Sequence, residues 1–300
     1  MSNQDDVREF LRTRRAKITP DRAGLPVYGG NRRVAGLRRE EVALLAGMSV
    51  DYYNRIERGN LHGASEGVLQ SISRALQLDE AETSHLFDLA RAANESSTKR
   101  HRSTPQRVRP SVQRILDAMT DAPAWVRNNR HDFVAANRLG FALYSPLFAD
   151  PVRPANTARF VFLNERSKSF YPNWEQSADD IVAILRSEAG SNAFDRGLTD
   201  LIGELPTRSE DFRRRWAAHN VRFHRTGIKN LHHPVVGDLE LSYESMELTS
   251  DPGLIFIAYT AEPDSASADG LQLLANWAAT QDDLERRPAP RPSTTQPTTN

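Results

Sequence analysis

The sequence contains no cysteine among its 300 residues. This absence excludes disulfide bonds, thiolate zinc sites, iron–sulfur clusters and cysteine nucleophiles. No apolar run approaches the roughly 18 to 20 residues that a membrane-spanning helix needs, so we expect no membrane association. The first ten residues include Asp5 and Asp6 where a secretory signal has a basic start and an apolar segment. These absences predict a cytoplasmic protein without a metal or other cofactor.

The eight histidines also form no ligand pattern. His219 and His224 lie five residues apart and His232 is adjacent to His233, whereas two ligands on one helical face need a spacing of about three or four residues. Residues 111–300 contain no nucleophile elbow, glycine-rich phosphate loop or paired acidic motif. We therefore expect no metal site and no enzymatic activity. An arginine or histidine of the segment WAAHNVRFHR stays a candidate for holding a ligand carboxylate.

Positive charge is unevenly distributed although the formal net charge is zero. Residues 1–110 contain 19 Lys and Arg against 14 Asp and Glu, whereas residues 111–300 contain 20 against 25. A basic N-terminal part is typical of proteins that bind a polyanion such as nucleic acid. Because only 4 of the 39 basic residues are lysine, genomic base composition is the alternative explanation of this arginine excess.

A polar segment divides the chain into two parts. Residues 94–110, NESSTKRHRSTPQRVRP, have almost no apolar side chains and predict a flexible basic linker. Residues 282–300 are rich in proline and threonine and predict a disordered tail. The sequence thus predicts an N-terminal domain over residues 1–93 and a C-terminal domain over residues 111–281.

The N-terminal domain is predicted to be all helical. Apolar residues recur at intervals of three and four, for example at Val7, Phe10 and Leu11, which is the pattern of amphipathic helices around a core. The stretch TPDRAGLPVYGGNRRVAG contains too many glycines and prolines to continue a helix. We expect a small bundle in which one unusually long loop joins the first two helices.

Residues 38–59 fit a helix-turn-helix motif. Two helices that cross through a tight turn need a small residue at their contact and a residue that tolerates positive φ in the turn, and Ala43 and Gly47 meet these needs. Ser49 is placed to cap the second helix and Gly59 to end it. The side chains expected to be buried are Val42, Ala46, Met48, Tyr53 and Ile56.

The second helix of such a motif enters the major groove of DNA. With Tyr53 and Ile56 facing the core, a rotation of about 100° per residue turns the other side chains outward. The predicted base-reading residues are Val50, Asp51, Tyr52 and Arg55. Arg55 suits a bidentate contact with guanine, Asp51 a contact with cytosine, and Val50 a contact with a thymine methyl group.

The motif RRVAGLRREEVALLAGMSVDYYNRIERG resembles the Cro/repressor-type (XRE) helix-turn-helix family, and the whole chain resembles the MmyB-like transcription regulators. The C-terminal segments RNNRHDFVAANRLGFALYSPLF and NTARFVFLNERSKSFYPNWE are similar to landmarks of the MmyB-like ligand-binding domain. This resemblance implies a transcription regulator that binds double-stranded DNA. It also implies a PAS-like second domain that holds a fatty acid or a similar apolar molecule.

Contacts with the DNA backbone are predicted for arginines around the motif and for two hydroxyl groups. The resemblance places Arg39 at the position that holds a phosphate. The Tyr53 hydroxyl must reach the rim of the core or a phosphate oxygen. The complete set of phosphate candidates is Arg32, Arg33, Arg38, Arg39, Ser49, Tyr53 and Arg58. Glu57 has a structural interpretation instead, as the partner of an arginine on the first helix, which is Arg12, Arg14 or Arg15.

Residues 111–281 are predicted to form an α+β domain. Short strands at 125–127 and 132–136 enclose a turn, and a helical stripe covers 198–205. The segment LELSYESMEL changes the phase of its alternation, which predicts a bulge near Ser245, and GLIFIAYTA is apolar on both faces and predicts a central strand. This order of elements is that of a PAS-like sensor domain with one antiparallel sheet.

Large aromatic side chains are frequent in the C-terminal domain. In a domain with helices over a sheet they mostly form the core, and some line a cavity. The candidates for contact with a ligand are Trp125, Phe133, Phe141, Phe160, Trp174, Trp216, Phe223 and Tyr243.

Together these features predict a sequence-specific, DNA-binding transcription regulator. We expect a homodimer that places two recognition helices in successive major grooves, and a C-terminal domain that senses a small apolar ligand. The alternative is a regulator whose C-terminal domain binds a protein partner and no small molecule, because an aromatic core is compatible with both.

Overall fold

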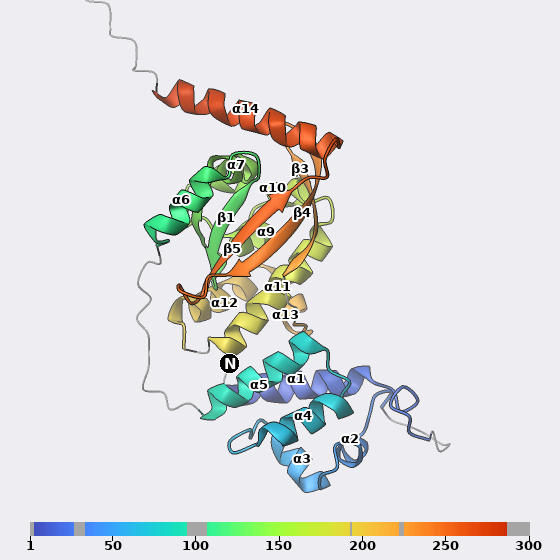
Figure 1. Ribbon diagram of the computed structural model, residues 1–300. Helices are drawn as coiled ribbons and strands as arrows, with labels where there is room; N and C mark the ends of the chain where they lie inside the picture. Colours follow the sequence, from blue (N-terminus) through green and yellow to red (C-terminus); the bar gives the residue numbers. More distant parts are fainter. Residues whose placement is uncertain (1–2, 27–33, 95–106, 193, 222–224, 287–300) are drawn as a thin grey trace, which may run out of the picture.

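The computed structural model describes residues 3–26, 34–94, 107–192, 194–221 and 225–286. They form two lobes, a helical domain at the bottom of Figure 1 and a sheet with helices above it. The predicted fold class, an all-α bundle followed by an α+β domain with an antiparallel sheet, is confirmed. Most of the predicted linker and of the predicted tail lies outside the described residues.

The described part of the N-terminal domain has five helices: α1 (Asn3–Lys17), α2 (Arg39–Leu45), α3 (Val50–Glu57), α4 (Glu66–Ala75) and α5 (Glu80–Asn94). The apolar stripe predicted for the first helix is confirmed, since Val7, Phe10 and Leu11 are completely buried. Helices of seven or eight residues are unstable alone in water. The shared core therefore holds α2 and α3 in place, with each buried large apolar side chain contributing about 1.5–3 kcal/mol.

The C-terminal domain alternates short strands with helices. Its elements are α6 (Pro110–Ala118), β1 (Ala124–Asn128), β2 (Phe133–Ala136), α7 (Arg138–Leu143), α8 (Ser145–Phe148), α9 (Thr157–Leu163), α10 (Arg166–Phe170), α11 (Trp174–Ser191), α12 (Arg196–Arg208), α13 (Glu210–Trp216), β3 (Thr226–His233), β4 (Gly237–Glu247), β5 (Leu254–Thr260) and α14 (Ala266–Arg286). The last helix runs past residue 281, where the domain was expected to end.

The strands form one antiparallel sheet in the order β2-β1-β5-β4-β3. The predicted hairpin is confirmed as β1 and β2, and the predicted central strand is β5. The predicted bulge near Ser245 is wrong, because the pairing of β4 with β5 continues without a shift to Glu247 opposite Ile255. Met246 is instead 47% exposed. The phase change thus reflects an apolar side chain on the open face.

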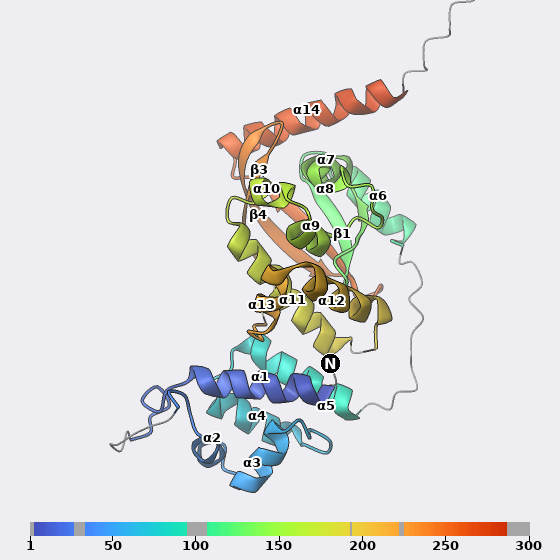
Figure 2. The same ribbon diagram turned by 180° about the vertical axis from the view of Figure 1, so that it is seen from behind.

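One face of the sheet carries the main core, and the other face is covered only in part, since β4 is exposed on that side. On the partly covered face, Val112 and Leu116 of α6 pack on Ala124 and Val126 of β1. The other face carries the main core, to which α7, α9, α11, α12 and α14 contribute, and Figure 2 shows α9, α11 and α12 in front of the sheet. No helix in the described part of the chain is long and apolar enough to cross a membrane.

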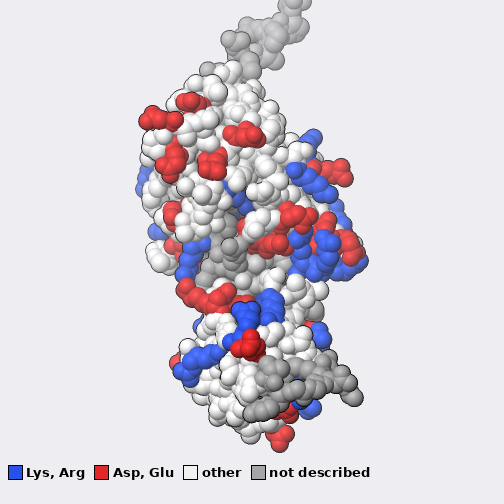
Figure 3. Space-filling model, turned by 90° about the vertical axis from the view of Figure 1, so that its right-hand side faces the viewer, with Lys and Arg blue, Asp and Glu red and all other residues white. Residues whose placement is uncertain are grey.

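The two domains pack against each other along a seam between α1 and α5 on one side and α11 and α13 on the other (Figures 1 and 2). The Ser191 hydroxyl donates to the Asp88 carboxylate at 2.6 Å, and the Lys17 ammonium donates to the Asn220 side chain at 2.8 Å. Val221 is buried in the core of the helical domain. On the surface, acidic and basic side chains lie next to each other along this boundary (Figure 3).

Candidate nucleic-acid interface and interdomain seam

The turn between α2 and α3 has the geometry that the sequence predicts. Gly47 has φ of +65° and Ala43 is completely buried. The Ser49 hydroxyl caps α3 by accepting the backbone N–H of Tyr52 at 3.2 Å. Gly59 follows α3 with φ of +97°, and a Cβ there would overlap the carbonyl oxygen of Gln4. Glycine is therefore required at position 59 by both its backbone angle and the close approach of α1.

Helix α3 presents three of the four predicted base-reading side chains away from the core, whereas Tyr52 packs in part against the core. Val50, Asp51 and Arg55 are exposed and Tyr52 is half-buried, whereas Ile56 on the opposite face is completely buried. The Arg55 guanidinium lies 4.9 Å from the centre of the Tyr52 ring. The predicted outward orientation is confirmed for Val50, Asp51 and Arg55 and only in part for Tyr52, and contact with bases stays a prediction.

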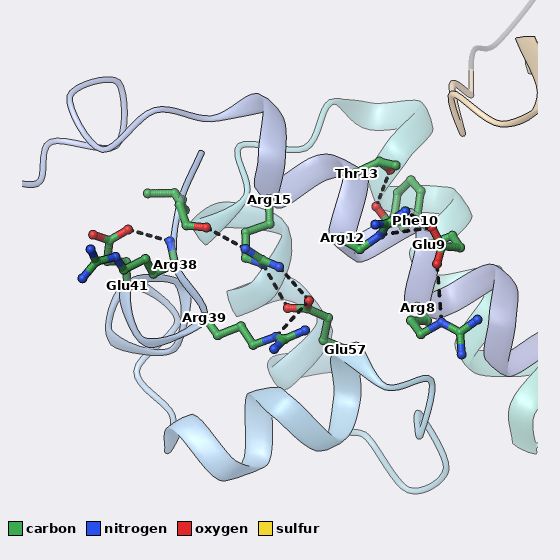
Figure 4. A network of polar contacts seen from close by, with 11 residues as sticks. Arg8, Glu9, Phe10, Arg12, Thr13, Arg15, Arg38, Arg39, Glu41 and Glu57 are labelled. Carbon is green, nitrogen blue, oxygen red and sulfur yellow. Dashed lines mark hydrogen bonds and ion pairs between the residues drawn. The ribbon is translucent and has the colours of Figure 1, made fainter. Parts of the chain in front are cut away.

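Glu57 joins the three helices of this region. It is only 2% exposed, and its carboxylate accepts from Arg15 Nε at 3.0 Å and Nη2 at 2.9 Å, and from Arg39 Nε at 3.1 Å. Figure 4 shows Arg15 of α1 and Arg39 of α2 converging on this carboxylate from α3. The expected pairing of Glu57 with the first helix is confirmed for Arg15. The ion pair with Arg39, which was not expected, fixes the start of α2 relative to α3.

Tyr53 is not available to a phosphate. Its side chain is completely buried, and its hydroxyl lies beneath the surface near Glu57 and Arg15. Burial, followed by the negative charge of Glu57, raises the pKa of the Tyr53 hydroxyl. The assignment of Tyr53 to the phosphate-binding group is therefore wrong, because this side chain fills the core of the motif.

The other phosphate candidates lie at the surface where the structure describes them. Ser49 and Arg58 are exposed, and the side chains of Arg38 and Arg39 are about half exposed. Arg32 and Arg33 lie outside the described residues. The expected buried set is confirmed for Val42, Tyr53 and Ile56, and Ala46 and Met48 are half-buried at its edge.

The aromatic ligand candidates fall into different places. Trp125, Phe160 and Tyr243 are buried in the main core, and Phe133 stacks on Trp125 with ring centres 3.9 Å apart. Trp174 donates its indole N–H to the Val161 carbonyl at 3.1 Å. Phe141 is 46% exposed beside a groove next to α6. Trp216 lines a cavity between the domains, and Phe223 lies outside the described residues.

Sequence reasoning missed a polar cluster inside the interdomain seam. Arg14, Arg186, His85 and His219 are each at least 95% buried there. Arg14 pairs with Glu82 at 3.1 Å and donates to the His219 carbonyl. One sequence signal for this cluster is Arg14, which stands on the apolar side of α1 with Phe10 and Leu11. A charged residue at a core position implies a partner on another element.

His232 and His233 make ordinary contacts. His232 lies 2.6 Å from the Asp238 carboxylate, and His233 Nε2 lies 3.1 Å from the Ala142 carbonyl. Over the described residues no group of three or more His, Asp or Glu side chains is arranged to hold a metal ion. His224 is outside this part of the chain.

Comparison with known proteins identifies both domains. Residues 108–274 match the family model described as "MmyB-like transcription regulator ligand binding domain". Residues 7–86 match the family model described as "Helix-turn-helix domain". A search among curated proteins gives no match. The first match covers more than half of the 300 residues, and together the two describe a DNA-binding transcription regulator with a ligand-binding domain. The chain therefore belongs to the family of MmyB-like transcription regulators.

Proposed function

We propose that this regulator binds a specific DNA sequence as a homodimer in the cytoplasm, with α3 of each protomer in the major groove. The observation that carries the proposal is the division of α3 into a buried face with Tyr53 and Ile56 and an exposed face with Asp51 and Arg55. A recognition helix needs this division, because base contacts come from side chains that the core does not use.

We further propose that the C-terminal domain senses a small apolar ligand and that DNA affinity changes when the ligand binds. The family match to a ligand-binding domain supports this. A fatty acid is the ligand class that the family resemblance implies. The competing function is capture of a protein partner, and the apolar groove beside α6, with Phe141 exposed at its edge, is the surface that favours it.

The DNA-binding proposal is tested by selecting bound duplexes from a random pool with the full chain. We expect enrichment of two related half-sites separated by about one helical turn of 34–36 Å, because a two-fold dimer presents its recognition helices at that spacing. Recovery of a single half-site would contradict the dimer, and recovery without sequence enrichment would contradict base reading.

The ligand proposal is tested by native mass spectrometry of freshly purified protein, compared with its mass after denaturation. An additional mass that is lost on denaturation and contains an acyl chain supports the fatty acid. Protein without extra mass, even after incubation with a panel of fatty acids, favours the protein-partner function.

A further inference from the structure

A cavity of about 580 Å³ lies inside the seam between the two domains. Helices α1 and α5 form its wall on the helical domain, and α11, α12 and α13 form its wall on the sheet domain. Most of its lining is apolar, including Leu89, Ala189, Leu198, Ile202 and Trp216. Cavities of this size and composition accommodate small organic molecules.

His85 lines this cavity and has two ring nitrogens without a hydrogen-bond partner. Its side chain is 97% buried. The ring is held in place by the edge of Phe10, with ring centres 5.0 Å apart, and by Gly190, where a Cβ would come 2.7 Å from Nδ1. A buried polar atom without a partner costs about 1–3 kcal/mol, so a ligand that pairs with these nitrogens removes a cost already present in the fold.

Arg186 contributes a further donor. Its Nη atoms are occupied by His219 Nδ1 at 2.9 Å and by the Trp216 carbonyl at 2.5 Å, and its guanidinium lies 3.9 Å from the centre of the Trp216 ring. Its Nε is buried and has no acceptor. The planar group is therefore fixed on two sides while one N–H remains unpaired.

The charges that line the cavity are balanced. Its titratable lining residues are Arg186, Asp6 and His85, and the Asp6 carboxylate lies 3.8 Å from Arg186. Burial, followed by the charges of Arg186 and Arg14, lowers the pKa of His85 to about 3, so the ring is neutral near pH 7. An additional buried carboxylate would have no cation of its own and would incur a desolvation penalty.

From these contacts we propose that the interdomain cavity binds an uncharged amphipathic molecule. Its apolar body lies against the Trp216 wall, and a carbonyl or hydroxyl oxygen accepts from His85 and Arg186. Because both domains form the walls, the bound molecule stabilises their packing on each other. A change of DNA affinity on binding of this molecule rests on the function proposed above. The binding site itself does not.

The test uses the full chain and two probes with the same body, 2-acetylnaphthalene and 2-naphthoate, in isothermal titration calorimetry without DNA. We expect the ketone to bind at least about tenfold more tightly than the carboxylate, a difference of about 1.4 kcal/mol. Equal or tighter binding of the carboxylate overturns the charge argument, and absence of heat with both probes overturns the site.

Three variants locate the binding. Gly203 lies at the wall of the cavity, where a Cβ meets no atom within 4 Å, so we choose Gly203→Trp to add an indole at this wall. Asp200→Trp on the same helix, 71% exposed and outside the lining, is the matched control. We expect Gly203→Trp to abolish ketone binding and Asp200→Trp to leave it unchanged. Equal affinities of these two variants would overturn the location.

The third variant, His85→Phe, keeps a ring of similar shape and removes both unpaired nitrogens. We expect ketone affinity to fall at least about tenfold while the melting temperature stays equal or rises. A lower melting temperature with unchanged affinity would assign His85 a purely structural role and overturn the proposal. The heat of ligand binding is measured without DNA, so failure of the protein to select a DNA site does not affect the calorimetric result. Failure of the calorimetric test likewise does not affect the DNA-selection result.

Discussion

Arginine serves opposite purposes on two sides of the helical domain. On the outer side Arg55 and Arg58 extend from α3 and its C-terminal end into solvent. On the inner side, at the seam, Arg14 of α1 and Arg186 of α11 in the other domain are each 98% buried and contact carboxylates, carbonyl oxygens and aromatic rings. An exposed guanidinium keeps its donors for a phosphate or a guanine, whereas a buried one uses them to hold elements together. The same residue type therefore marks both the DNA-facing surface and the seam.

Glu57 pairs with one mostly buried guanidinium, that of Arg15, and with one half-exposed guanidinium, that of Arg39. Removing its carboxylate gives the largest expected effect on stability. Glu57→Ala leaves Arg15, whose side chain is 14% exposed, without its partner. We expect the free energy of unfolding to fall by about 3–5 kcal/mol, the usual cost of breaking a buried pair on one side. Urea denaturation measures it. Glu40→Ala, which removes an exposed partner of Arg38, is the control and should change stability by about 0.5 kcal/mol or less. Similar losses of unfolding free energy in Glu57→Ala and Glu40→Ala would contradict the difference between buried and exposed ion pairs.

The second largest expected effect is on the stability of the buried seam, and it depends on pH. Burial and neighbouring cations lower the pKa of His85 to about 3, and burial, then Arg186, lowers that of His219 to about 4. The folded state thus favours the neutral rings, and this stability is complete above pH 6.5 and is lost as the pH falls toward 4. Glu188, whose pKa burial raises to about 6, acts in the opposite direction with a smaller shift.

We therefore expect the free energy of unfolding to fall between pH 6.5 and pH 5, with His85 alone responsible for about 2 kcal/mol. Urea denaturation of the wild type and of His85→Phe at pH 7.5 and pH 5 isolates this contribution, because the variant lacks the titrating ring. Parallel losses in the two proteins would show that His85 does not titrate in this range.

On the exposed side, Arg55→Ala tests base reading. We expect affinity for the selected duplex to fall by about 1–3 kcal/mol while affinity for a scrambled duplex changes little. Fluorescence anisotropy at fixed salt compares the two duplexes. An equal loss on both would assign Arg55 to the DNA backbone.

The smallest effect is expected for Arg58→Ala. A phosphate contact weakens binding to every duplex by a similar amount and reduces the slope of log affinity against log salt by about one unit. A salt titration with both duplexes measures this slope. A loss confined to the selected duplex would move Arg58 into the base-reading group. Arg39→Ala is expected to weaken binding to both duplexes too, and it also removes a contact of Glu57.

The sequence predicted the motif well because each of its positions has its own steric requirement. Gly47, Ala43 and Ser49 are restricted by a backbone angle, a close helix contact and a cap. Tyr53 was assigned incorrectly because the rule for its position requires burial but does not say what becomes of a hydroxyl. In the sheet, the phase change near Ser245 was taken for a bulge, although an exposed Met246 produces the same pattern.

The seam was not predictable in the same way. Arg14, His85 and Arg186 are far apart in the sequence, and their contacts depend on how two separately folded units meet. Arg14 stands on the apolar side of α1, and a charged side chain at such a position needs a partner. No spacing rule identified those partners.

Helix α1 is shared by the two functional regions. At its first turn, Gln4 lies against Gly59 at the end of α3 with no room for a Cβ, while Asn3 and Asp6 on the same turn line the seam cavity. Packed helices transmit displacement as stiff bodies. Helix α1 therefore joins the seam cavity to the end of α3 within a single turn. A molecule bound in the cavity would therefore contact the same helical turn that packs against the end of α3.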